Sequence, residues 1–123
     1  MASRPIAKFP VITNGDMSAD ITSLPSIITN LSLMSYDISW AGSSPVGVMS
    51  IQVSNTYSEN PDGSVNNPGK WTTVTLSSTP SVSGNTGNGF IDLSQLGAYA
   101  VRLVFTFTSG TGLMNAVFNA KAE

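Results

Sequence analysis

The chain has 123 residues, the usual size of a single domain, with a net charge of only −2. Charged residues make up 10% of it, against about 25% in ordinary soluble domains, so its surface is unusually neutral. It contains no cysteine and no histidine, which excludes disulfides, thiolate or imidazole zinc sites and any mechanism that uses a histidine base.

Residues 1–15 contain Pro5 and Pro10 among apolar side chains. Because proline cannot donate to a β-ladder, we expect an N-terminal arm or an edge strand here, followed by a β-sandwich domain over residues 16–123. In an assembly such an arm can lie on a neighbour's sheet edge. No apolar run resembles a signal peptide or a membrane span, so we expect synthesis in a host cytoplasm.

Alternation of apolar and polar residues predicts the strands. The segments are residues 16–22, 31–41, 46–54, 71–76, 90–93, 99–108 and 113–118. Short glycine-containing turns at 42–45 and 109–112 predict two β-hairpins, and we place the second at the centre of the sheet. The predicted fold class is all-β, a single-domain antiparallel β-sandwich of jelly-roll type with about eight strands and no helix.

Two long polar loops, residues 55–70 and 77–89, interrupt this pattern, and loops of this length are often functional. The pair Asp62-Gly63 predicts the tip of a small hairpin, with an ordinary solvated insertion as the alternative. The glycines at 84–89 indicate a flexible turn, because neither a helix nor a lysine accompanies them. Oxygen-bearing side chains in the first loop form a candidate calcium site. They are Asn55, Glu59, Asn60 and Asp62.

No catalytic constellation emerges from these residues. Glu59 and Asp62 are the nearest candidates for a carboxylate pair, but they lie in a polar loop without the burial that would raise the pKa of a general acid. The five basic residues are scattered, whereas nucleic-acid binding needs a concentrated positive surface. We therefore expect a protein that is not an enzyme and that uses no cofactor, no metal, no nucleic acid and no membrane.

Three ordered segments carry a family resemblance. They are Ser50-Ile-Gln-Val-Ser-Asn55, Trp71-Thr-Thr-Val74 and Tyr99-Ala-Val-Arg-Leu103. Over roughly residues 36–118 they resemble the galactose-binding-like jelly rolls of the discoidin type. The chain also resembles small virion proteins of tailed bacteriophages, capsid decoration or tail-associated proteins, with the string Q-V-S-N…W-T-x-V…R-L-V-F/Y-T…S-G-T-G-x-x-N-A.

Each of these residues also has a purely structural interpretation. Trp71 at a strand start can cover the edge of the core, and Arg102 can lie across the sheet face with its stem on apolar surface. Ser54 and Asn55 can close a turn through their own side chains.

The phage resemblance and the neutral surface lead to one functional expectation. It is a virion structural protein, a capsid decoration or cement protein, that binds the major capsid protein or other virion subunits and forms a homo-oligomer, with a trimer favoured. The expected interface residues are Ile6, Phe9, Val11, Tyr57 and Asp62. The alternative is a carbohydrate-binding module of a phage tail or host-recognition protein, with Tyr57 and Trp71 contacting the sugar.

Overall fold

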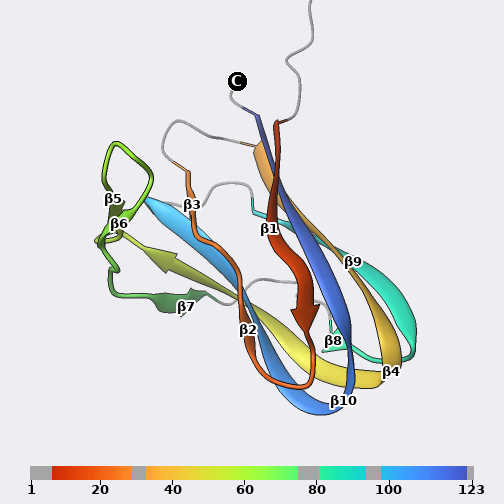
Figure 1. Cartoon of the computed structure of the whole chain (residues 1–123). Helices are drawn as coiled ribbons and strands as arrows, with labels where there is room; N and C mark the ends of the chain where they lie inside the picture. Colours follow the sequence, from red (N-terminus) through yellow and green to blue (C-terminus); the bar gives the residue numbers. More distant parts are fainter. Residues whose placement is uncertain (1–6, 29–32, 75–80, 94–97, 122–123) are drawn as a thin grey trace, which may run out of the picture.

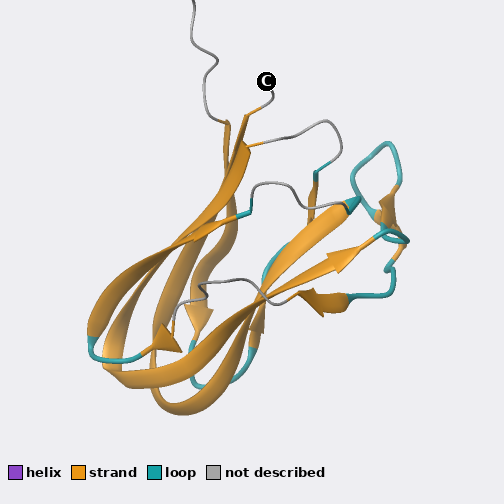
Figure 2. Ribbon diagram, turned by 180° about the vertical axis from the view of Figure 1, so that it is seen from behind, coloured by secondary structure: helices purple, strands orange, loops and turns teal. Residues whose placement is uncertain are grey.

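The computed structural model describes residues 7–28, 33–74, 81–93 and 98–121. Strands dominate these residues, and none of them belongs to a helix long and apolar enough to span a membrane (Figure 2). The strands are β1 (Ala7–Asp16), β2 (Ile21–Thr22), β3 (Ser26–Ile27), β4 (Leu33–Ser54), β5 (Ser58–Glu59), β6 (Val65–Asn67), β7 (Thr72–Val74), β8 (Ser81–Val82), β9 (Thr86–Asp92) and β10 (Ala100–Lys121). Eight of them form one antiparallel sheet, and β5 and β6 form a separate two-stranded ribbon.

The all-β class and the antiparallel sheet of about eight strands are therefore confirmed. The jelly-roll closure stays a prediction, because all eight strands belong to a single sheet that runs through β4 and β10.

The centre of this sheet is a long ribbon made of β4 and β10. Each strand has 22 residues, and the two pair antiparallel from Ala100 opposite Ser54 to Lys121 opposite Leu33. The ribbon bends sharply midway (Figure 1). One half is flanked by β1 and β9, and the other by the short strands β2 and β3 on β10 and β7 and β8 on β4.

Both predicted hairpins are wrong. Residues 46–54 pair with residues 100–109 of β10 and not with residues 34–41, so each supposed hairpin is one continuous strand that crosses the bend. The glycine stretches lie at the bend itself, where two register shifts between Phe107 and Thr111 interrupt the ladder. Such bulges kink a strand and increase its twist without ending it.

Glycine is needed at the bend because the two backbones almost touch. A Cβ atom on Gly42 would collide with the Cα of Gly112, and Gly110 has a φ of 86°, which favours glycine. Asn85 stabilises the bend from the side, since its Oδ1 accepts from the Ser44 amide at 2.9 Å and its carbonyl accepts from the Gly42 amide at 2.7 Å.

One hydrophobic cluster fills the space between the two halves of the ribbon. Alternate residues of both halves contribute to it, including Tyr36 and Phe118 from one half and Ile51, Leu103 and Phe105 from the other. The rings of Tyr36 and Phe118 pack with centroids 5.4 Å apart. Full burial of a side chain of this size contributes about 1.5–3 kcal/mol, so the cluster is the main stabilising element of the fold.

The strand predicted at 90–93 starts earlier, at Thr86, so part of the expected loop 77–89 is the regular strand β9. Gly87 lies opposite Trp40, and a Cβ atom at Gly87 would collide with the indole ring. The glycine thus makes room for a core tryptophan and does not form a flexible turn.

The N-terminal segment is an edge strand over its described part. β1 pairs with β10 of its own chain, from Ala7 opposite Ala120 to Asp16 opposite Leu113. Pro10 lies within it, and register shifts occur on either side of Ile12. The boundary at residues 15 and 16 stays a prediction.

Candidate functional site

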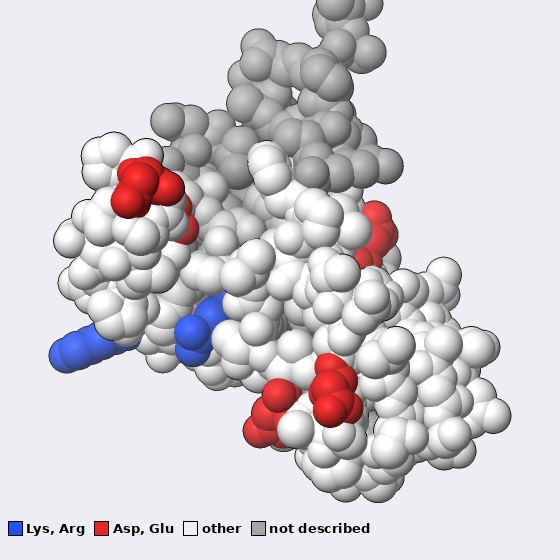
Figure 3. All heavy atoms as spheres, in the orientation of Figure 1, with Lys and Arg blue, Asp and Glu red and all other residues white. Residues whose placement is uncertain are grey.

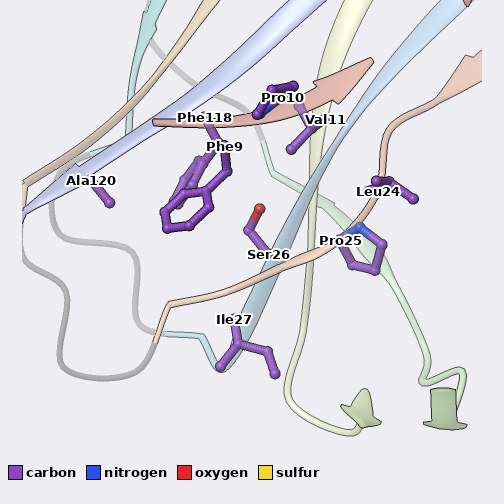
Figure 4. A pocket seen from close by; sticks show the side chains of 9 residues that line it. All are labelled: Phe9, Pro10, Val11, Leu24, Pro25, Ser26, Ile27, Phe118 and Ala120. Atoms are coloured by element: carbon purple, nitrogen blue, oxygen red, sulfur yellow. The ribbon is translucent and has the colours of Figure 1, made fainter. Parts of the chain in front are cut away.

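An apolar groove opens between β1 and the segment that leads into β3 (Figure 4). Its volume is about 420 Å³, and Phe9, Val11, Leu24, Pro25, Ile27 and Phe118 are among the residues that line it. Phe9 is 50% exposed and Leu24 is 66% exposed, which is high for side chains of this size in a folded domain.

Local structure explains why these side chains remain uncovered. The irregularity after Pro10 turns both Val11 and Ile12 into the core, and Phe9 is left at the rim, where its ring lies 6.3 Å from that of Phe118. On the other wall, the Leu24 amide donates to the Val11 carbonyl at 3.0 Å and fixes the two segments together. This backbone hydrogen bond therefore fixes the position of one wall of the groove relative to the other.

The structure places the predicted interface residues in two separate regions. Phe9 and Val11 line the groove, whereas Tyr57 and Asp62 belong to the stretch around the β5–β6 ribbon, away from β1 (Figure 1). Ile6 lies outside the described residues. Sequence reasoning missed Leu24, although the neighbouring Pro25 marks a segment that cannot continue a regular strand.

The small hairpin predicted around Asp62-Gly63 is present. Ser58 pairs with Asn67 across the β5–β6 ribbon, and Gly63 takes a φ of 92° at its tip. The Asp62 carboxylate accepts from the Ser64 hydroxyl at 2.6 Å and from its amide at 3.0 Å. These hydrogen bonds lower the pKa of Asp62.

The four candidate calcium ligands are each engaged in a hydrogen bond within the protein. Besides Asp62, the Asn60 side-chain amide donates to the Ser64 hydroxyl at 3.0 Å. A Glu59 oxygen accepts from the Tyr57 hydroxyl at 2.5 Å, and Asn55 Oδ1 accepts from the Tyr99 amide at 2.8 Å. In the observed arrangement, the oxygens of Asn55, Glu59 and Asp62 accept hydrogen bonds from groups of the protein itself.

A stack of three side chains joins this ribbon to the sheet. The Tyr57 and Trp71 rings pack with centroids 5.7 Å apart, and the Arg102 guanidinium lies 4.3 Å above the Trp71 ring. Trp71 Nε1 donates to the Pro68 carbonyl at 2.8 Å, and Arg102 Nε donates to Gln52 Oε1 at 2.8 Å. Cation–π contacts of this kind stabilise by about 0.5–2 kcal/mol.

The turn-closing role predicted for Ser54 is observed, whereas the Asn55 side chain accepts from the distant Tyr99 amide. Ser54 Oγ accepts from the amides of Thr56 at 3.2 Å and Tyr57 at 3.1 Å, which closes the turn after β4. Tyr57 is only 4% exposed, so its ring is covered. Of the two residues considered for sugar contact, Trp71 is partly accessible, and Arg102 covers one of its faces.

Tyr57 makes the stability of the protein sensitive to alkali. Burial, together with the adjacent Glu59 carboxylate, raises the pKa of Tyr57 from 10.0 to about 12. The neutral phenol is favoured in the folded state, so its stabilising contribution is complete below pH 10.0 and is lost as the pH rises towards about 12. We expect Tyr57→Phe to flatten this part of the stability curve, measured by urea unfolding at stepped pH. An unchanged alkaline slope would contradict the assignment.

Charge is sparse over the described surface. Figure 3 shows one face on which most atoms belong to uncharged residues, with acidic and basic groups in small separate patches. A second, more polar depression of about 290 Å³ lies on the outer face of β4, β9 and β10, where Asp37, Ser39, Asn88 and Asn115 line it. Asp37 accepts there from the Asn119 side-chain amide at 2.8 Å.

Comparison with protein-family models finds no match, and comparison with curated proteins finds none either. Among solved structures, the SPBc2 prophage-derived protein YomS is similar. It is 10% identical, with a TM-score of 0.46 over 97% of this chain and 96% of that chain. A likeness at this level does not establish a shared fold or a shared function.

Proposed function

We propose that this protein is a structural subunit of a bacteriophage particle, a decoration or cement protein that acts through contacts with other virion subunits. The observation that carries the proposal is the apolar groove with its half-exposed Phe9 and Leu24. Contiguous exposed apolar surface with a polar surround is typical of protein–protein contact sites. The sparse surface charge and the phage resemblance in sequence support the same function.

The proposed mechanism is mechanical. An apolar side chain of a neighbouring copy enters the groove and covers Leu24 and Phe9, so contact is driven by burial and needs no ion pairing. The major capsid protein is the proposed partner beneath the oligomer. A closed ring is the expected arrangement for repeated identical contacts, and a trimer would match the three-fold positions of a capsid.

The first test is quantitative mass spectrometry of purified particles. We expect the protein in every particle, in a copy number that is a multiple of three. Absence of the protein from particles that contain the major capsid protein in full amount would overturn the proposal.

A matched pair of variants tests the groove itself. Leu24→Asp places a charge in the groove, and we expect at least about tenfold weaker retention on particles, equivalent to about 1.4 kcal/mol. Val65→Asp, at a side chain that is 53% exposed on β6, serves as the control and should bind like the wild type. Circular dichroism checks that both variants fold. Equal retention of the two variants would contradict a role for the groove.

The carbohydrate-binding alternative has less structural support. It relied on Tyr57 and Trp71 as an aromatic platform, but Tyr57 is buried and Trp71 is stacked under Arg102. Binding on a glycan array that Trp71→Ala abolishes would favour this alternative over the virion role.

A further inference from the structure

The edges of the sheet are protected to very different degrees. Unpaired strand edges invite pairing with other chains, and proteins normally protect them with proline, bulges or very short strands. β1 contains Pro10 and two register shifts, and β2, β3, β7 and β8 have only two or three residues each. β9 has seven residues and pairs with β4 without a single shift from Thr86 to Asp92. It contains no proline and no lysine.

The hydrogen bonds at the two ends of β9 show which backbone groups face away from β4. The Leu93 amide donates to Met34 at 2.9 Å, and Asn85 accepts from the Gly42 amide at 2.7 Å. In an antiparallel ladder, residues that bond to the partner alternate with residues that point away. The odd-numbered residues therefore bond to β4, and Thr86, Asn88 and Phe90 direct their amides and carbonyls to the opposite edge. Within the described parts of the chain, no strand pairs with that edge.

We propose that this edge pairs antiparallel with β9 of a second copy of the chain, about a two-fold axis through Gly89. Gly89 is the middle residue of Thr86–Asp92, so this register overlaps all seven residues of both strands. Asn88 then lies opposite Phe90 of the second copy and exchanges two backbone hydrogen bonds with it. The symmetry repeats this pair once, and the sheet continues from one copy into the other.

Side chains and charge agree with the same register. Phe90 is 62% exposed on the outer face of β9. In the paired strands the two Phe90 rings become diagonal neighbours at about 7–8 Å, within reach of aromatic contact. Asp92, the one charged residue of β9, falls opposite Thr86 of the second copy, so the two carboxylates lie at opposite ends of the contact. Because the two carboxylates do not face each other, the contact does not require a partner strand of opposite charge. This favours a second copy of the chain over a partner with a charged strand.

This contact is separate from the apolar groove and does not depend on the virion role. A particle that lacks the protein would overturn the virion proposal and leave the β9 contact standing. Loss of the β9 contact would leave binding through the groove unaffected.

Sedimentation equilibrium at about 100 µM protein tests the contact, since a specific symmetric interface should be populated at this concentration. We expect an even number of copies for the wild type, a dimer through β9 alone or a hexamer where the proposed trimer also forms through the groove. Asn88→Pro removes an outward amide without touching the ladder to β4 and should halve the mass. Phe90→Lys places a charge on the same edge and should do the same. Phe107→Lys, at a side chain 36% exposed on β10, is the matched control and should keep the wild-type mass.

Amide hydrogen exchange provides a second readout that a folding defect cannot mimic. In the wild type, the Asn88 and Phe90 amides should exchange at least about tenfold more slowly than in Phe90→Lys, while amides of β10 stay equally protected. A wild-type monomer, an odd number of copies, or a mass that both β9 variants leave unchanged would overturn the proposal.

Discussion

We expect replacement of Gly110 by alanine to destabilise the protein by about 3–5 kcal/mol, a large part of the stability of a domain of this size. Gly110 has a φ of 86°, and an added Cβ atom would lie 2.6 Å from the Ser44 carbonyl carbon and 2.8 Å from the Pro45 Cα. Both neighbours are backbone, so neither can move without opening the bend. Urea unfolding measures the change.

Gly63→Ala is the matched control for this prediction. Gly63 has a similar φ of 92°, but no atom lies within 4 Å of a Cβ at that position. Only the conformational penalty remains, about 1–2 kcal/mol. If both variants lost the same stability, the close backbone contact at the bend would not be the cause.

The second large effect is expected for Phe105→Ala, which should cost about 3–5 kcal/mol. Phe105 is fully buried, and its ring packs directly on Gly47 of the neighbouring strand, where a Cβ atom would already be too close. Gly47 has no side chain that could fill the space, so we expect a cavity to remain. Thermal and urea unfolding both report the loss.

Phe107→Ala, two residues further along the same strand, is the control. Phe107 is 36% exposed, and its truncation should cost less than about 1.5 kcal/mol. A loss at Phe107 equal to that at Phe105 would show that the burial pattern of β10 is not the one described.

The faces of the strands could be predicted from the sequence, but their partners could not. Alternation places Val101, Leu103 and Phe105 on one side, and all three are buried. A second alternating run from Met114 to Phe118 also faces this core. Two alternating runs joined by glycines give the same sequence pattern in a hairpin and in one bent strand. Whether a glycine stretch reverses the chain or only bends it depends on which distant strand pairs with it. A local sequence pattern does not specify that strand.

The candidate site shows the same limit. Phe9 and Val11 are visible as apolar residues in a proline-bearing arm, but Leu24 becomes part of a groove only because its amide bonds to Val11. Tyr57 is a candidate for interface and sugar contact in the sequence because it is an aromatic residue in a polar loop. It is buried because Trp71 folds back onto it, and that contact spans a turn whose path the composition of the loop does not specify.

The position of β10 has a consequence for the order of events during biosynthesis. It is the last strand described, yet β1, β2, β3 and β4 all pair with it. Until residues 100–121 are present, β1, β2 and β3 lack the strand with which they pair, and β4 can pair only with β7, β8 and β9. Completion of the fold should therefore be late and slow, on the millisecond-to-second scale of topologies dominated by distant pairings. Chaperones would then have the most exposed apolar surface to protect before β10 becomes available for pairing.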